Sequence, residues 1–433
     1  MQLTPISGHL VTDEHAHRVV APPYDALTPQ QRRAYVAHEP DSYLAVLPAA
    51  GDGSDDLDAN HHALARLVAS GCFRPLPSSA LLIQELVTEH GRIRAILGDL
   101  PALAFRDGRV RPHESVRADR VDALADHLST VGAASSPVSV IHPPDPRVSR
   151  LTEEQVAGPP AVDATLTDGT RLRVWAVTDP DAQSALAGAV AAAGPLTVAD
   201  GHHRAAAVSA ALGDDGPVLT AASPADHFDV LAFHRRIAGL EGIEVASVQA
   251  ALPAALQPLT DPGDTPARGT VHLAIDGRWF ALELPQTGVG DPTSGDHDPV
   301  AALDATRVQL SVIEPLRALA DDPDAVHVVP VPATAGAEPL AEPGSVGVAL
   351  HPPSIDDLLE VAAVGAAMPF KSTYLVPKLR SGVVVVARTD AAPEELRPAG
   401  PTAPGAARPD AGPVGPPSRS EAADSGDDVR FRP

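Results

Sequence analysis

Residues 195–212 read PLTVADGHHRAAAVSAAL, and this stretch decides the fold. A short apolar run typical of a buried strand is followed by an Asp-Gly turn and then by an Ala-rich segment with high helix propensity. The pattern therefore predicts a strand, a tight turn and a helix in direct succession. Together with similar alternations elsewhere in the chain, it indicates an α/β fold with mixed α+β character.

The turn itself carries polar groups suited to an anion. Gly201 lets the backbone turn sharply, and the amides after it point out of a helix N-terminus, where negative charge is favoured. Arg204 lies one turn further and can bind a phosphate or carboxylate, while His202 and His203 are possible donors or metal ligands. Asp200 is a candidate phosphate-site or metal-site residue. The alternative is a plain turn with solvent-facing histidines and Asp200 as N-cap. A run of polar groups between an apolar strand and a helix favours the site.

Composition limits the kinds of partner. The 433 residues carry a formal net charge of −24, which disfavours nucleic acid and anionic membranes as partners. The single cysteine, Cys72, excludes an intramolecular disulfide and is expected to be a buried apolar residue. We find no transmembrane-length apolar stretch and no signal-like N-terminal segment, so a cytoplasmic protein is expected.

Four regions are expected along the chain. The first, residues 1–142, is an α/β region with the motif PHES, and the second, 143–240, carries DGHHR. The third, 241–389, is an α/β region with MPFKSTYLVPK, and residues 390–433 form a Pro- and Gly-rich tail expected to be disordered.

Local patterns within these regions predict several elements. Thr28 and Pro29 indicate a helix start, and residues 58–70 and 121–131 have helical spacing. Strands are predicted at 81–87, 93–97, 102–105, 138–142, 271–275, 279–284 and 383–387, with a hairpin around residues 168–169. Residues 288–299 are expected to form an acidic loop.

The motif PHES places Glu114 between a predicted strand and an amphipathic helix. A carboxylate at such a position can project into a cleft as a general base or a metal ligand, and His113 could tune it. Arg117 and Arg120 could hold an anion, but pairing with Asp119 on a solvated helix face explains them equally well.

The lysines of the chain are concentrated in MPFKSTYLVPK. Among 32 basic residues only Lys371 and Lys378 are lysines. They are expected where a compact ammonium is needed and a planar guanidinium does not fit. With Ser372 and Thr373 they offer an ammonium and two hydroxyls to phosphate or carboxylate oxygens, although the glycine-rich frame of a P-loop is missing.

Two further segments give weaker signals. APPYD places Tyr24 and Asp25 in a rigid turn, which can be purely structural. FHRR, residues 233–236, could bring a second His-Arg pair to the site or could cap a strand. His61 and His62 belong to an ordinary solvated helix face.

The motifs APPYD, PHES, ADGHHR, FHRR and MPFKSTYLVPK, in this order, resemble the bacterial and archaeal family called domain of unknown function ten-fifteen, over about residues 19–388. The DGHHR element also resembles the phosphate-binding turn of the ParB/sulfiredoxin-like superfamily, which includes CTP-binding partition proteins, sulfiredoxin and kinases that phosphorylate free serine. The resemblance implies a ParB-like core with a nucleotide phosphate at residues 201–204. It also places Glu114 where free serine kinases have their proposed general base. The catalytic cysteine of sulfiredoxin has no counterpart here, which argues against that activity.

These observations predict a phosphotransferase that moves a nucleotide phosphate to a small hydroxylated metabolite, with free L-serine as the best candidate. Glu114, His113 and His202 are the expected catalytic residues. The expected cofactors are a nucleotide (ATP, ADP or CTP) and Mg²⁺ held by Asp200 and Glu114. One alternative is a metal-dependent hydrolase using the His, Asp and Glu side chains. Another is a ParB-type nucleotide-binding switch without turnover.

Overall fold

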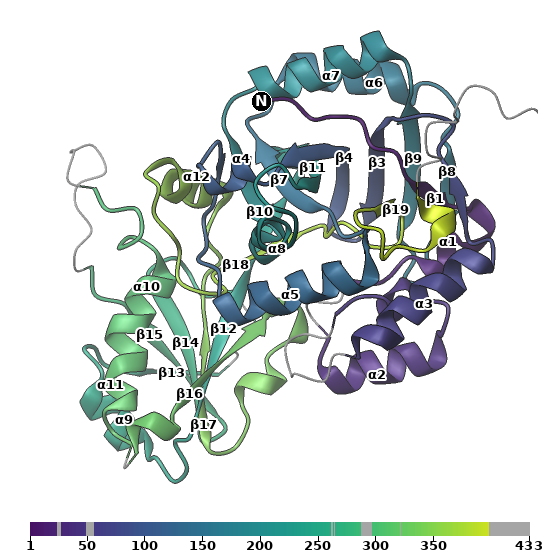
Figure 1. Ribbon diagram of the computed structural model, residues 1–433. Coiled ribbons are helices and arrows are strands. Elements are labelled where there is room, and N and C mark those ends of the chain that lie inside the picture. Colours follow the sequence, from purple (N-terminus) through teal and green to yellow (C-terminus); the bar gives the residue numbers. More distant parts are fainter. Residues whose placement is uncertain are drawn as a thin grey trace, which may run out of the picture. The chain divides into compact units, whose positions relative to one another are not determined.

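The computed structural model describes residues 1–23, 27–48, 56–260, 263, 265–286, 297–320 and 322–397 (Figure 1). It has the mixed α/β fold expected from the sequence, with strands in three sheets. Tyr24, Asp25, most of the predicted acidic loop and the tail beyond residue 397 lie outside the described residues. The helices are α1 (Asp13–Val19), α2 (Pro29–His38), α3 (Leu57–Ala69), α4 (Leu103–Arg106), α5 (Ala118–Val131), α6 (Pro146–Val156), α7 (Pro180–Ala192), α8 (His202–Leu212), α9 (Val245–Ala251), α10 (Asp304–Val308), α11 (Glu314–Arg317) and α12 (Ile355–Ala363).

An eight-stranded sheet forms the centre of the fold, in the order β5-β10-β7-β11-β4-β3-β9-β8. Its strands come from both sides of residue 142, so the first two regions expected from the sequence build one sheet. Most neighbours are antiparallel, while β11 runs parallel to β7 and β10 parallel to β5. The strands are β3 (Leu81–Thr88), β4 (Gly91–Pro101), β5 (Val110–Arg111), β7 (Val138–His142), β8 (Val162–Thr165), β9 (Arg171–Val177), β10 (Leu196–Asp200) and β11 (Pro217–Pro224).

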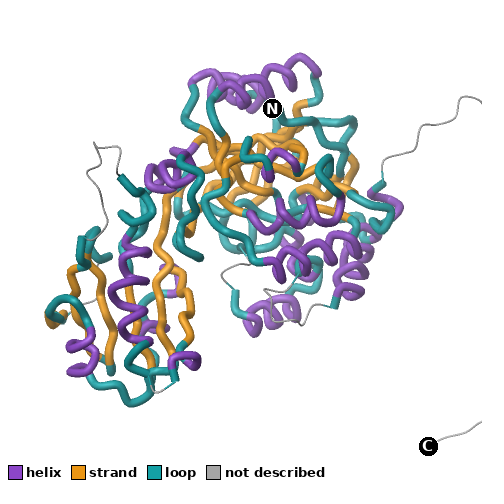
Figure 2. The backbone as a smooth tube through the Cα atoms, turned by 60° about the vertical axis from the view of Figure 1, so that its left-hand side comes forward, coloured by secondary structure: helices purple, strands orange, loops and turns teal. Residues whose placement is uncertain are grey.

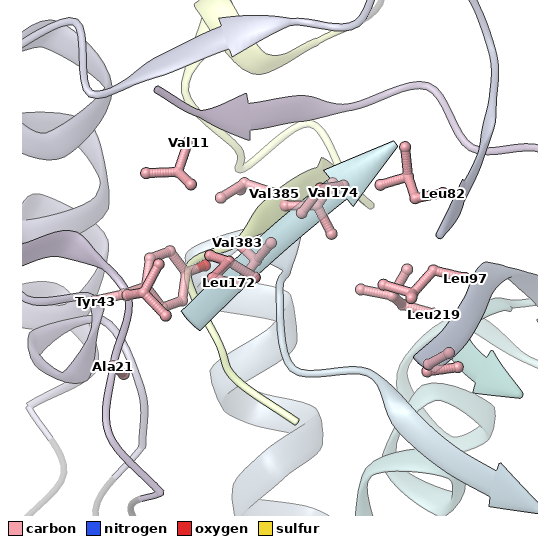
Figure 3. Close-up of a cluster of buried hydrophobic side chains, with 14 of the residues drawn as sticks. Val11, Ala21, Tyr43, Leu82, Leu97, Leu172, Val174, Leu219, Val383 and Val385 are labelled. Carbon is pink, nitrogen blue, oxygen red and sulfur yellow. The ribbon is translucent and has the colours of Figure 1, made fainter. Parts of the chain in front are cut away.

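Both faces of the central sheet are covered. On one face Leu82, Leu97 and Val174 share a buried cluster with Val11 and Val385 of a smaller sheet (Figure 3). On the other face, residues such as Ile83 and Ile96 cluster with the apolar side chains of α6 and α7. Because the strands are buried on both sides, they read as continuous apolar runs in the sequence.

Most local predictions are confirmed. Thr28 caps α2 with a complete capping box, and the hairpin around residues 168–169 joins β8 to β9. The predicted strand at 102–105 is wrong, since these residues start the short helix α4. The amides of Ala102 and Leu103 donate to the carbonyls of Gly216 and Asp214, which ends the sheet pairing there and lets the helical turn begin.

A second sheet of seven strands lies in the C-terminal half, in the order β13-β15-β14-β17-β12-β16, with β18 also paired to β12. Helices lie against this sheet (Figure 2). Val248 of α9, Val308 of α10 and Leu316 of α11 belong to the buried cluster beside it. The strands are β12 (Asp229–Ala238), β13 (Gln257–Leu259), β14 (Thr270–Ile275), β15 (Arg278–Glu283), β16 (His327–Pro332), β17 (Ser345–Ala349) and β18 (Thr373–Val376). The long strand β12 pairs β16 and β17 along its later half and β18 along its first half.

The smallest sheet joins the two ends of the described chain, in the order β2-β1-β19-β6. Strand β19 (Val384–Ala387) inserts between β1 (His9–Val11) and β6 (Ala133–Ala134), and β2 (Phe73–Pro75) completes the sheet. After β19, Ala392 and Leu396 are buried against the same cluster. Packed structure therefore continues past residue 389, where the sequence suggested that a disordered tail begins.

No helix in the described part of the chain has the length and apolar character needed to cross a membrane.

Candidate functional site

The three motifs singled out in the sequence meet around one cavity of about 290 Å³. Glu114 follows β5, residues 200–204 connect β10 to α8, and Lys371 and Lys378 flank β18. The other lining residues are Arg117, Asp119, Arg120, Leu124, Ala199, Phe233, Phe370, Thr373 and Leu375. Two predicted site residues lie outside the lining: His113 is buried behind it, and the Ser372 hydroxyl donates to the Pro369 carbonyl at 2.6 Å.

Backbone pairing fixes the PHES and MPFKST segments to each other. The amide of Met368 donates to the carbonyl of His113 at 2.8 Å, and Glu114 and Met368 form a parallel bridge. The amide of Lys371 then donates to Oε1 of Glu114 at 3.1 Å. The candidate base is thus oriented by a segment more than 250 residues away in sequence.

The turn at residues 200–204 has the expected geometry but a different arginine position. A bulge between Val198 and Asp200 interrupts the pairing of β10 with β7, and Gly201 has a φ of +103°, which favours glycine. A Cβ on Gly201 would meet the guanidinium of Arg204 at 2.9–3.1 Å, because this side chain folds back over the turn. Arg204 donates to Asp200 and, at 3.2 Å, to the carbonyl of Pro137.

Asp200 is held as an anion between two cations. Its Oδ1 lies 3.1 Å from Nζ of Lys378, and its Oδ2 accepts from Arg204. Burial alone would raise the pKa of the Asp200 carboxyl, but Lys378 and Arg204 together hold it well below its usual range. Nζ of Lys378 also lies 4.8 Å from the ring centre of Tyr374, within reach of a cation–π interaction.

Glu114 has the opposite electrostatic setting. Burial raises the pKa of its carboxyl, and the amide and ammonium of Lys371 only partly oppose this. A carboxylate with a raised pKa accepts a proton more readily near neutral pH, as a general base requires.

Three histidines support the cavity as neutral acceptors. Nδ1 of His113 donates to the Val198 carbonyl at 2.6 Å, so its Nε2 accepts from the Thr373 hydroxyl at 3.1 Å. Nε2 of His202 accepts from the His113 amide at 3.3 Å, and Nε2 of His203 accepts from the Arg117 amide at 3.0 Å.

Burial is the main cause of a lowered pKa in each of these rings, and the pKa of His113 falls to about 4. These side chains therefore tie PHES, DGHHR and β18 together.

Arg235 is a site residue that the sequence indicated only weakly, through FHRR. Its side chain is 6% exposed, and its guanidinium donates to the carbonyls of Phe370 and Lys371, each at 3.1 Å. It also donates to the carbonyls of Phe233 and His234. Burial lowers the pKa of Arg235 to about 10, and the nearby Glu114 opposes this.

The turn held by Arg235 is strained. Lys371 has a φ of +56°, the left-handed region that side chains with a Cβ rarely adopt. Its Nζ lies 5.2 Å from the ring centre of Phe233 and 5.8 Å from that of Phe370, so the ammonium stands between two aromatic rings at the cavity wall. Strain of this kind persists where the surroundings over-determine it, and it is concentrated at functional sites.

The structure pairs one of the two arginines beyond PHES with Asp119 and places both at the cavity. Nε of Arg117 donates to Asp119 at 3.1 Å in an exposed ion pair, as the structural alternative predicted. Arg117 and Arg120 also line the cavity. They add positive charge at its edge.

No group of three or more His, Cys, Asp and Glu side chains is placed to hold a metal ion among the described residues. The sequence placed both Asp200 and Glu114 at a metal. Asp200 fits poorly as a direct ligand because Lys378 and Arg204 occupy its oxygens. Glu114 lines the cavity and keeps the chemistry of an oxygen ligand.

The sequence profile of the family described as "Protein of unknown function (DUF1015)" matches residues 3–306, so the chain belongs to this family. No curated protein matches the chain.

Several solved structures are distantly similar. One is a free serine kinase variant in complex with ADP, with 13% sequence identity and a TM-score of 0.35, covering 66% of this chain and 88% of the kinase. A conserved hypothetical protein from Pyrococcus furiosus has 14% identity and a TM-score of 0.33, covering 65% and 90%. The C-terminally truncated SbnI from Staphylococcus aureus has 12% identity and a TM-score of 0.35, covering 67% and 83%.

Proposed function

We propose that this protein is a phosphotransferase that moves a phosphoryl group from a nucleotide to the hydroxyl of a small metabolite, with free L-serine as the first acceptor to test. The observation that supports it best is one cavity in which a carboxylate with a raised pKa faces a helix N-terminus and several cations. Phosphoryl transfer needs this combination, because its catalysis is mostly positioning and charge stabilisation.

Each group has a role in this proposal. Glu114 takes the proton of the acceptor hydroxyl while the hydroxyl oxygen of the acceptor bonds to the phosphorus that is transferred. The bond between this phosphorus and the oxygen of the remaining nucleotide breaks. The amides at the start of α8 bind phosphate oxygens, while Lys371 and Lys378 neutralise their charge. His113 and His202, expected from the sequence to be catalytic, act here by holding Val198, Thr373 and the His113 amide in place.

Mg²⁺ would reach the cavity together with the nucleotide. Magnesium sites commonly use one or two carboxylates together with phosphate oxygens. If a protein carboxylate holds the ion here, it is Glu114, whose role would then be that of a metal ligand instead of a general base. The bound ion would neutralise phosphate charge. Asp200 would stay paired with Lys378 and Arg204 and would keep both cations directed at the cavity.

The metal-dependent hydrolase finds less support. The ring nitrogens of His113 and the Nε2 atoms of His202 and His203 are engaged with protein groups, and a transition-metal site needs such nitrogens. A ParB-type switch would use the same phosphate-binding turn, and turnover separates it from a kinase.

The deciding experiment compares Glu114→Gln with wild type and with the control Asp122→Asn on the exposed face of α5. Phosphoserine formation would be measured with ATP, ADP and CTP, each with Mg²⁺ and L-serine, beside calorimetric nucleotide affinity and melting temperature. We expect Glu114→Gln to lower turnover by roughly 10²–10⁴ and to change nucleotide affinity little, while the control matches wild type. Full turnover in stably folded Glu114→Gln would refute the mechanism. A parallel loss of Mg²⁺ affinity would make Glu114 a metal ligand.

A further inference from the structure

A second cavity of about 80 Å³ adjoins the charged one. Leu124 of α5 and Arg204 of α8 line both cavities, so these two side chains form the boundary between them. Helices α5 and α8 pack side by side here (Figure 1). The second cavity continues along α8 from Arg204 to Val208, one turn further on.

The chemistry of this second cavity differs from that of the first. Aliphatic side chains dominate its wall, including Leu47, Leu128, Val208 and Val218. Its polar lining residues are Tyr43, His127, Ser135, Ser136 and Arg204. Nε2 of His127 donates to the Val46 carbonyl at 2.7 Å, Oγ of Ser135 donates to the Val384 carbonyl at 2.6 Å, and Oγ of Ser136 lies 2.6 Å from Oγ of Ser381. A largely aliphatic cavity with a few polar groups at its wall can take a flat, uncharged ligand group.

We propose that the second cavity binds the aromatic base of the nucleotide whose phosphates occupy the charged cavity. This inference rests on the proposed function, since it assigns the remainder of the same ligand. A nucleotide joins a flat, uncharged aromatic ring to a polyanion through a short ribose. The two adjoining cavities match these two parts of the nucleotide. The second cavity has aliphatic walls for the ring, and the charged cavity beyond Arg204 has lysines and helix amides for the phosphates. Small-molecule sites typically combine apolar walls with a few placed polar groups in this way.

The lining also indicates how the base is recognised. Because Nε2 of His127 and Oγ of Ser135 are already bonded within the protein, the wall offers shape and apolar contact more than hydrogen bonds to the edge of the base. Pockets without such hydrogen bonds discriminate weakly between similar ligands. We therefore expect only weak discrimination between different bases.

Val208→Phe fills the second cavity, and Ala210→Phe is the matched control because residue 210 is exposed on the same helix. Calorimetry would measure binding of ADP and of tripolyphosphate, which has no base and carries one phosphate more than ADP. We expect Val208→Phe to weaken ADP at least about tenfold while tripolyphosphate binding stays within about twofold of wild type. The control should bind both ligands as wild type does.

The possible failures are distinguishable. If folded Val208→Phe binds ADP as tightly as wild type, the base pocket is wrong and the phosphate site stands. If wild type binds ADP no better than pyrophosphate, which carries two phosphates without the base, the base adds nothing and the pocket is again wrong. If wild type binds neither ligand, the proposed function fails and the pocket with it.

Should Val208→Phe unfold or lose both ligands, Leu128→Ala decides, because it removes part of the same wall from α5. Weaker ADP binding with unchanged tripolyphosphate binding supports the pocket, and unchanged binding of both overturns it.

Discussion

Acid should destabilise this protein through His113. The ring is buried and neutral, and its two nitrogens bond Val198 and Thr373. Burial lowers its pKa from 6.5 to about 4, so the unfolded chain binds more protons than the folded one between these pH values. Stability therefore falls as the pH drops through this window. Between pH 7 and pH 4.5 the loss from this one group is roughly 2–3 kcal/mol.

Urea unfolding of wild type and of His113→Asn between pH 7 and pH 4.5 tests this expectation. Asparagine keeps a donor near Val198 but cannot titrate, so the free energy of unfolding should fall less with acid in the variant, by roughly 2–3 kcal/mol. The control His62→Asn, on the exposed surface of α3, should follow wild type. Equal acid sensitivity in wild type and His113→Asn would refute the reasoning, whatever the stability of the variant at pH 7.

Three further changes have definite expected outcomes. Arg235→Met should lower the melting temperature, because buried carbonyls lose donors worth roughly 1–3 kcal/mol each. It should also weaken nucleotide binding, because the turn at Lys371 is no longer held in place. Wild-type nucleotide affinity in this variant would show that the turn keeps its conformation without Arg235. Lys371→Gly should raise stability by up to about 1 kcal/mol, because glycine adopts a φ of +56° without strain, and it should lower nucleotide affinity. Thermal melts and calorimetry on one preparation measure the two effects. Unchanged nucleotide affinity would show that Lys371 does not belong to the phosphate site. Truncation after Thr389 should lower the melting temperature by several degrees, because it removes buried Leu396, whose burial is worth about 2 kcal/mol. An unchanged melting temperature would show that residues 390–397 add no stability.

The strand–turn–helix at residues 195–212 was predictable because every signal for it is local. Its apolar run, its glycine and its Ala-rich helix specify adjacent elements, and β10 and α8 form there. Lys371 and Lys378, which the scarcity of lysine singled out, both line the cavity, and their role there stays a prediction. In both cases the sequence signal lies within a short segment of the chain.

Other features could not be predicted because their causes lie far away in the chain. Arg235 reaches carbonyls about 135 residues later, and no short pattern records such a bond. Asp200 and Arg204 each suggested an open site residue, yet the fold pairs them with each other and brings Lys378 to the same carboxylate. The short apolar run at residues 102–105 is compatible with either a strand or a helix. Backbone hydrogen bonds to Gly216 and Asp214 end the sheet pairing there, and a helix forms.

The insertion of β19 between β1 and β6 has a consequence for synthesis on the ribosome. One edge of β1 has no strand to pair with until residues 384–387 have left the exit tunnel. Lys371 and Lys378 also emerge late, so the candidate site cannot assemble on a nascent chain that already carries Glu114 and Gly201. Until that point the growing polypeptide presents an open strand edge, a surface at which other chains can pair and aggregate.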